Sequence, residues 1–195
     1  MKPVLLITLV LCQFLSFSQT NSISSKNLKE SADDESDFAY SLPYEKGTSY
    51  LLVQAYQSKI LSHKGEYALD FMMKQGTKVC AARGGVVVDV KQDSEKGGIA
   101  PKYLSQGNHV VIRHDDGTYG NYWHLEHNGA LVHVGDTVEQ GQPIGLAGRT
   151  GYAAFSHLHF EVTTKQRTGH DQLPTRFITR DGKRYLRPMH WYTSI

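Results

Sequence analysis

Residues 156–162 read Ser-His-Leu-His-Phe-Glu-Val, and this stretch decides the fold class. Polar and apolar side chains alternate along it, which is typical of a β-strand with one buried face. On such a strand residues i and i+2 point to the same side, so His157 and His159 project together while Leu158 and Phe160 enter the core. Two adjacent imidazoles are suited to metal binding and acid–base chemistry, although two surface histidines on a sheet would give the same pattern.

Short runs of β-branched and aromatic residues recur on both sides of this stretch, separated by turn residues. Asp116-Gly117 lies between two such runs and predicts a β-hairpin. Asp181-Gly182 predicts another hairpin within residues 177–186. Many short strands joined by turns are typical of antiparallel sheets and sandwiches. The predicted fold class is therefore all-β, with an antiparallel sheet or sandwich core and an appended C-terminal hairpin.

The composition narrows the function classes. The chain has 195 residues, with 21 Lys and Arg against 19 Asp and Glu and a formal net charge of +2. This near balance excludes a strongly basic nucleic-acid-binding protein, so we expect no nucleic-acid partner. The two cysteines are too few for a small fold held together by disulfides.

The N-terminus has the features of an export signal. Met1-Lys2-Pro3 precedes an apolar run over residues 4–17, and small residues follow, which predicts a secretory signal peptide over residues 1–18. The run is shorter than the roughly 20 apolar residues that a membrane span needs, so we expect no stable span after cleavage. The mature protein is expected in the periplasm or outside the cell. Cys80 would remain as a single buried thiol.

The rest of the chain divides by composition into three further segments. Residues 19–45 are polar and acidic, which predicts a linker. The strand-rich domain is expected over residues 46–163, and residues 164–195 are expected to form an accessory C-terminal segment.

The motifs of the central domain, taken in order, resemble a known family. Asp70-Phe71, His124-Leu125 and residues 157–162 follow one another as in the LytM/lysostaphin-type zinc peptidases, peptidase family M23. The resemblance spans roughly residues 60–163. Members of that family are antiparallel β enzymes, most of which cut peptide cross-links in bacterial cell walls. The resemblance implies one Zn²⁺ per chain and a peptidoglycan or peptide substrate.

The resemblance also implies roles for individual residues. Asp70 and His159 match the positions of metal ligands. His124 and His157 match the two catalytic histidines, which would flank the attacking water. A neutral imidazole at either position could take the proton of that water and later protonate the leaving amine.

The first metal ligand departs from the family pattern. The family has a histidine four residues before the aspartate, where this chain has Glu66, and the nearest upstream histidine is His63. Three possibilities follow: His63 binds the metal through a turn or bulge at Lys64-Gly65, Glu66 replaces the histidine, or the site is incomplete. His63 is the expected ligand, because two nitrogens and one carboxylate are a common zinc ligand set.

Tyr122 is a candidate for contact with substrate. It lies two residues before His124, so a regular strand would place both side chains on one face. A packed aromatic side chain is the alternative. Together with the predicted signal peptide, the resemblance implies a secreted zinc-dependent endopeptidase that acts on the stem peptides or cross-bridges of peptidoglycan. The alternative function is a catalytically inactive LytM-like module that binds the cell wall or activates a partner wall hydrolase.

Overall fold

A computed structural model describes residues 39–57, 65–166 and 171–195, and the predicted signal peptide and His63 lie outside these ranges. The described residues form β-strands and one short 3-10 helix, η1. None of them forms a helix with the length and hydrophobicity to cross a membrane. The elements are β1 (Ser49–Gln54), β2 (Ala68–Met72), β3 (Lys78–Cys80), β4 (Gly85–Lys91), β5 (Gly97–Gly98), η1 (Pro101–Gln106), β6 (Asn108–Arg113), β7 (Tyr119–Ala130), β8 (Thr137–Val138), β9 (Pro143–Ala147), β10 (Gly151–Tyr152), β11 (His157–Thr163), β12 (Gln172–Leu173), β13 (Phe177–Thr179), β14 (Gly182–Arg184) and β15 (His190–Thr193).

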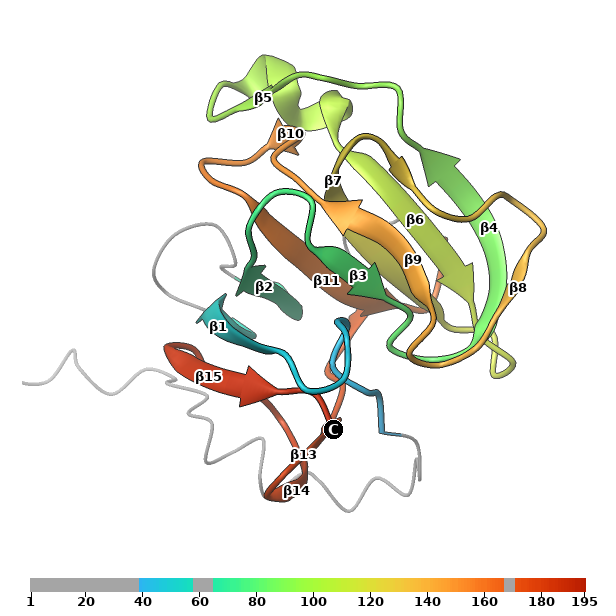
Figure 1. Ribbon diagram of the computed structural model, residues 1–195, viewed down its shortest axis with the longest axis vertical. Coiled ribbons are helices and arrows are strands. Elements are labelled where there is room, and N and C mark those ends of the chain that lie inside the picture. The colour runs from blue at the N-terminus through green and yellow to red at the C-terminus, as the bar shows by residue number, and fades with distance from the viewer. Residues whose placement is uncertain (1–38, 58–64, 167–170) are drawn as a thin grey trace, which may run out of the picture. The chain divides into compact units, whose positions relative to one another are not determined.

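Eleven of these strands form one sheet (Figure 1). Its main path runs in the order β15-β1-β2-β11-β7-β6-β4-β8, while β12 pairs with β11 and β9 pairs with both β3 and β7. Every strand pair within this sheet is antiparallel. The predicted all-β antiparallel fold class is confirmed, and so is the hairpin at Asp116-Gly117, which joins β6 to β7.

The central strands bury one face and present the other to the functional site. In β11, Leu158 and Phe160 are at most 1% exposed, as the alternation of the sequence predicts. Each fully buried side chain of this size contributes about 1.5–3 kcal/mol to the free energy of unfolding. The side chains that these strands bury in the same core are Leu69, Phe71, Val110, Ile112, Tyr122, Leu158, Phe160 and Val162.

Strand β7 changes its pairing halfway along. Trp123 pairs with His159 of β11 and with His109 of β6, whereas Leu125 pairs with Asn108 of β6 and begins the pairing with β9. The register therefore shifts by one residue, and His124 is the extra residue of a β-bulge, with a φ of 67°. Beyond the bulge β7 continues into the layer of β9 and β3, which cross in front of β11 in Figure 1.

The described part of the predicted linker belongs to the core. Tyr40, Leu42 and Tyr44 are at most 3% exposed, and the Tyr44 ring packs edge-on against Phe71 with ring centroids 5.5 Å apart. The prediction of a linker as far as residue 45 is therefore wrong at its C-terminal end. Residues 42–44 are all buried, and Pro43 interrupts any alternation of apolar and polar residues in this segment.

The C-terminal segment contributes strands to the main sheet. Residues 177–184 form the predicted hairpin of β13 and β14. In addition, β12 pairs with β11, and β15 pairs with β1, so that Trp191 lies opposite Leu51. Two strands that follow residue 164, β12 and β15, thus extend the sheet that contains β2, β7 and β11.

Candidate active site

Four of the predicted site residues converge on the sheet face opposite the core. Asp70 of β2 pairs directly with His159 of β11, and His157 lies two residues before His159 on the same strand. His124 of β7 completes the group: its ring centroid lies 4.6 Å from that of His157 and 5.8 Å from that of His159. The fold thus brings together one carboxylate and three imidazoles from three adjacent strands.

Asp70 is the most buried member of this group, with 2% of its surface exposed. Its Oδ1 lies 2.9 Å from Nδ1 of His159 and 3.7 Å from Nε2 of His157. Its Oδ2 accepts a hydrogen bond of 2.7 Å from the side-chain amide of Gln54 on β1. Burying a carboxylate is costly unless hydrogen bonds replace water, so Gln54 both stabilises Asp70 and fixes its orientation.

The surroundings separate the pKa values of two of the histidines. Burial acts to lower the pKa of His159, but the hydrogen bond and negative charge of Asp70 outweigh it and raise that pKa to about 8. Burial lowers the pKa of His124 to about 3, assisted by the positive charges of His157 and His159. At neutral pH His124 is therefore a neutral imidazole, which is the form that accepts a proton.

Backbone carbonyl groups set the proton positions on two rings. Nδ1 of His124 lies 2.7 Å from the carbonyl oxygen of Thr150, and Nδ1 of His157 lies 2.9 Å from that of Phe155. A carbonyl oxygen only accepts hydrogen bonds, so Nδ1 carries the proton in both rings. When the ring is neutral, Nε2 is therefore the nitrogen without a proton in both histidines, and it can accept one.

The bulge explains both the position of His124 and the failure of one prediction. Because Trp123 pairs with His159, a regular strand would direct the next side chain, His124, into the core. The extra residue and the left-handed backbone of His124 bring its ring to the site instead. Tyr122 lies in the core, where it is fully buried and its hydroxyl accepts a hydrogen bond from the backbone N–H of Ala82. The prediction that Tyr122 contacts substrate is therefore wrong.

Asp70 and His159 fit two positions of a zinc site. Their Oδ1 and Nδ1 atoms are 2.9 Å apart, and two ligand atoms of a tetrahedral zinc ion lie about 3.3 Å apart. The expected third ligand, His63, lies outside the described residues. Within those residues no group of three or more His, Cys, Asp or Glu side chains is placed to hold a metal ion.

Sequence reasoning missed two residues that support the site. Gln54 lies in β1, outside the stretch that carries the resemblance, and a glutamine in a strand gives no signal of a bond to Asp70. Thr150 lies between β9 and β10, and its carbonyl bond to His124 depends on the bulge. Both contacts are tertiary and have no pattern in the local sequence.

Comparison with known proteins gives the family. The model of "Peptidase family M23" matches residues 63–171, more than half of the chain. Two relatives are a glycyl-glycine endopeptidase, ALE-1 of Staphylococcus capitis, and a peptidoglycan DD-endopeptidase, ShyA of Vibrio cholerae. The chain is 33% identical to ALE-1 over 111 residues, which cover 55% of this chain and 28% of that protein. It is 35% identical to ShyA over 109 residues, which cover 56% of this chain and 22% of that protein.

A solved structure agrees with this assignment. Lysostaphin of Staphylococcus simulans superimposes with a TM-score of 0.50 and 30% identity, over 64% of this chain and 46% of that one. This chain thus matches less than two thirds of the length of each of these relatives. The extent of the family match, together with the shared antiparallel fold, shows that the chain belongs to peptidase family M23.

Proposed function

We propose that this chain is an exported zinc-dependent endopeptidase that hydrolyses peptide bonds of bacterial peptidoglycan, in its stem peptides or cross-bridges. The observation that carries the proposal is the convergence of Asp70, His124, His157 and His159 on one sheet face. The names of two relatives, a glycyl-glycine endopeptidase and a peptidoglycan DD-endopeptidase, support the substrate class. The predicted signal peptide over residues 1–18 supports export.

Zinc would be held by Asp70, His159 and His63. When bound, zinc supplies Lewis-acid chemistry: it polarises the peptide carbonyl and makes a water molecule more acidic. The buried carboxylate of Asp70 faces His159 and is oriented by Gln54, so two of the three donors need little rearrangement. We propose one zinc ion per chain.

His124 acts as the general base in this proposal. Its low pKa keeps the ring neutral, so Nε2 can accept the proton of the attacking water. The hydrogen bond from Nδ1 to the carbonyl of Thr150 holds the ring in the tautomer that this step needs. His157, whose ring centroid lies 4.6 Å from that of His124, accepts this proton on Nε2 and passes it to the leaving amine.

Metal content is the first test of this site. The mature protein, purified and supplied with zinc, should hold about one zinc ion per chain by plasma mass spectrometry. His63→Ala should lose the metal, while Glu66→Ala should retain it. Loss of zinc with Glu66→Ala instead would assign the third ligand to Glu66. Absence of zinc in the unmutated protein would contradict a zinc enzyme.

Cleavage of purified peptidoglycan is the second test. The zinc-loaded protein should release fragments with new amino termini, which mass spectrometry of the products identifies together with the bond cut. Chelation should stop the release, and added zinc should restore it. A zinc-loaded protein that binds peptidoglycan without cutting it would favour the alternative function, a LytM-like module that binds the wall or activates a partner hydrolase.

A further inference from the structure

Several hydrogen bonds hold the bulge of β7 from outside the strand. We propose that Thr150 is a positioning residue for His124: its buried hydroxyl fixes the bulge and, through it, the orientation of the His124 ring. Thr150 does not touch the substrate or the metal in this proposal. The inference rests on the proposed function, in which His124 is the general base.

The backbone of His124 needs such support. Its φ of 67° lies in the left-handed region, which is unfavourable for any residue with a Cβ atom. A conformation of this kind persists only where the surrounding structure holds it. The ring of His124 reaches the site because of this conformation, so whatever holds the bulge also positions the ring.

Thr150 makes three hydrogen bonds around the bulge. Its carbonyl oxygen accepts the bond of 2.7 Å from Nδ1 of His124. Its hydroxyl donates a bond of 2.6 Å to the carbonyl of Leu125 and accepts one of 2.9 Å from the backbone N–H of Asn108. Thr150 is 5% exposed, so water does not readily replace these bonds. The hydroxyl therefore ties the residue after His124 to the start of β6.

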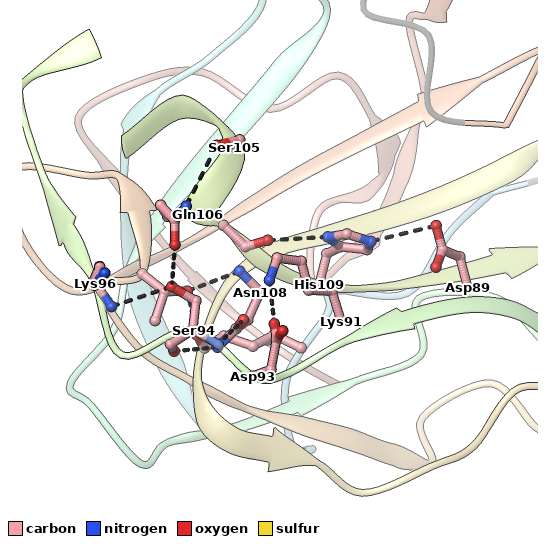
Figure 2. A network of polar contacts seen from close by, with 12 residues as sticks. Asp89, Lys91, Asp93, Ser94, Lys96, Ser105, Gln106, Asn108 and His109 are labelled. Atoms are coloured by element: carbon pink, nitrogen blue, oxygen red, sulfur yellow. Dashed lines mark hydrogen bonds and ion pairs between the residues drawn. The ribbon is translucent and has the colours of Figure 1, made fainter. Parts of the chain in front are cut away.

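Figure 2 shows Asn108 beside Ser94, and the same side chain also holds the next residue of the bulge. Its side-chain amide donates a bond of 3.2 Å to the carbonyl of Glu126 and one of 2.8 Å to the carbonyl of Ser94. Its side-chain oxygen accepts a bond of 3.1 Å from the backbone N–H of Ser94. Asn108 is fully buried. The consecutive residues 124, 125 and 126 are thus each bound by Thr150 or Asn108.

The backbone that carries Thr150 is itself closely confined. The next residue, Gly151, has a φ of 79°, and a Cβ atom there would lie 2.6 Å from Cα of Gly107. Its backbone N–H donates a bond of 2.8 Å to the carbonyl of Lys96. The backbone of Thr150 is therefore held in place next to β6. The hydrogen bond from its hydroxyl to the carbonyl of Leu125 then holds the bulge against this fixed backbone.

The first test compares Thr150→Val, which keeps the shape but removes the hydroxyl, with Thr150→Ser, which keeps the hydroxyl. Thr179→Val is the matched control: Thr179 is 6% exposed, donates to the carbonyl of Gly182 and accepts from the N–H of Asp181, but lies in the β13–β14 hairpin. In Thr150→Val, kcat on peptidoglycan should fall about 10–100-fold, with KM and zinc content unchanged. Thr150→Ser and Thr179→Val should keep kcat within about threefold of the parent.

A fall in kcat of less than about threefold in Thr150→Val, or an equal fall in Thr179→Val, would overturn the proposal. A second readout does not depend on activity: ¹⁵N spectra of the imidazoles should show His124 with its proton on Nδ1 in the parent and in Thr150→Ser. In Thr150→Val, the same ring should populate both tautomers. An unchanged spectrum would overturn the positioning role even if the protein cut no peptidoglycan, whereas a changed spectrum without cleavage would remove only the proposed function.

Discussion

The two halves of the active site are built in different ways. Asp70, His157 and His159 occupy regular positions on β2 and β11, where the alternation of the strands and their register place the side chains. His124 sits on a β-bulge with a left-handed backbone and is held by bonds from β6 and from the segment after β9. The proposed metal ligands therefore depend on the sheet, and the proposed general base depends on contacts between distant segments.

The largest effect is expected where the regular half is broken. His159→Ala removes an imidazole that lies 2.9 Å from Asp70, so the protein should lose both bound zinc and all measurable cleavage. Metal analysis and a peptidoglycan digestion assay check this. His127→Ala, which removes an exposed histidine of β7, should change neither. Full zinc occupancy in His159→Ala would show that His159 is not a ligand.

A substitution of His124, the residue on the bulge, should lower kcat and leave zinc binding unchanged. His124→Ala removes the proposed general base, and general acid–base catalysis contributes about 10²–10⁴-fold, so kcat should fall by that factor. Zinc content should stay at the parental value, because the metal half does not include His124. A variant that lost zinc together with turnover would show that the two halves are not separable.

A smaller effect is expected for the partner of Asp70. Gln54→Ala removes the hydrogen bond of 2.7 Å to Oδ2 of Asp70, and the loss of such a supporting contact weakens metal binding about 10–100-fold. Competition with a chelator of known affinity measures the change. Gln140→Ala removes a comparable amide, which bonds to the carbonyl of Ala82 outside the site, and should leave zinc affinity unchanged. Equal affinities in the two variants would mean that Gln54 does not support the ligand.

The smallest effect is expected on the core side of β7. Tyr122→Phe removes the hydroxyl that accepts the backbone N–H of Ala82, which should lower the free energy of unfolding by about 1–2 kcal/mol. KM and kcat should not change, because Tyr122 points away from the site. Urea unfolding and steady-state kinetics measure both quantities. If Tyr122→Phe raised KM and left the free energy of unfolding unchanged, Tyr122 would be a residue that contacts substrate.

The regular half could be predicted from the sequence. Period-two alternation over residues 157–162 placed His157 and His159 on one face and Leu158 and Phe160 in the core, and the structure agrees. The antiparallel fold class and the hairpins at 116–117 and 181–182 also follow from short-range signals, since turn residues and strand alternation are local properties.

The bulged half could not be predicted in the same way. The spacing of two residues placed Tyr122 and His124 on one face of a regular strand. One extra residue in a β-bulge moves the second side chain to the other face, and the sequence around Trp123 gives no signal of such a bulge. The bonds of Thr150 and Asn108 that hold it come from elsewhere in the chain. The buried residues 40, 42 and 44 were missed for a different reason: they follow an acidic stretch, and Pro43 leaves the short segment without a strand-like alternation.

The pairing of β15 with β1 bears on how the protein is made. These strands belong to residues 190–193 and 49–54, so one edge of the sheet forms only after nearly all of the described chain has been synthesised. Until then the outer backbone groups of β1 lack their strand partner, and an uncovered strand edge is a template for association with other chains. A nascent or truncated chain that lacks β15 should therefore aggregate more readily than a chain that contains it, because β15 covers the outer edge of β1.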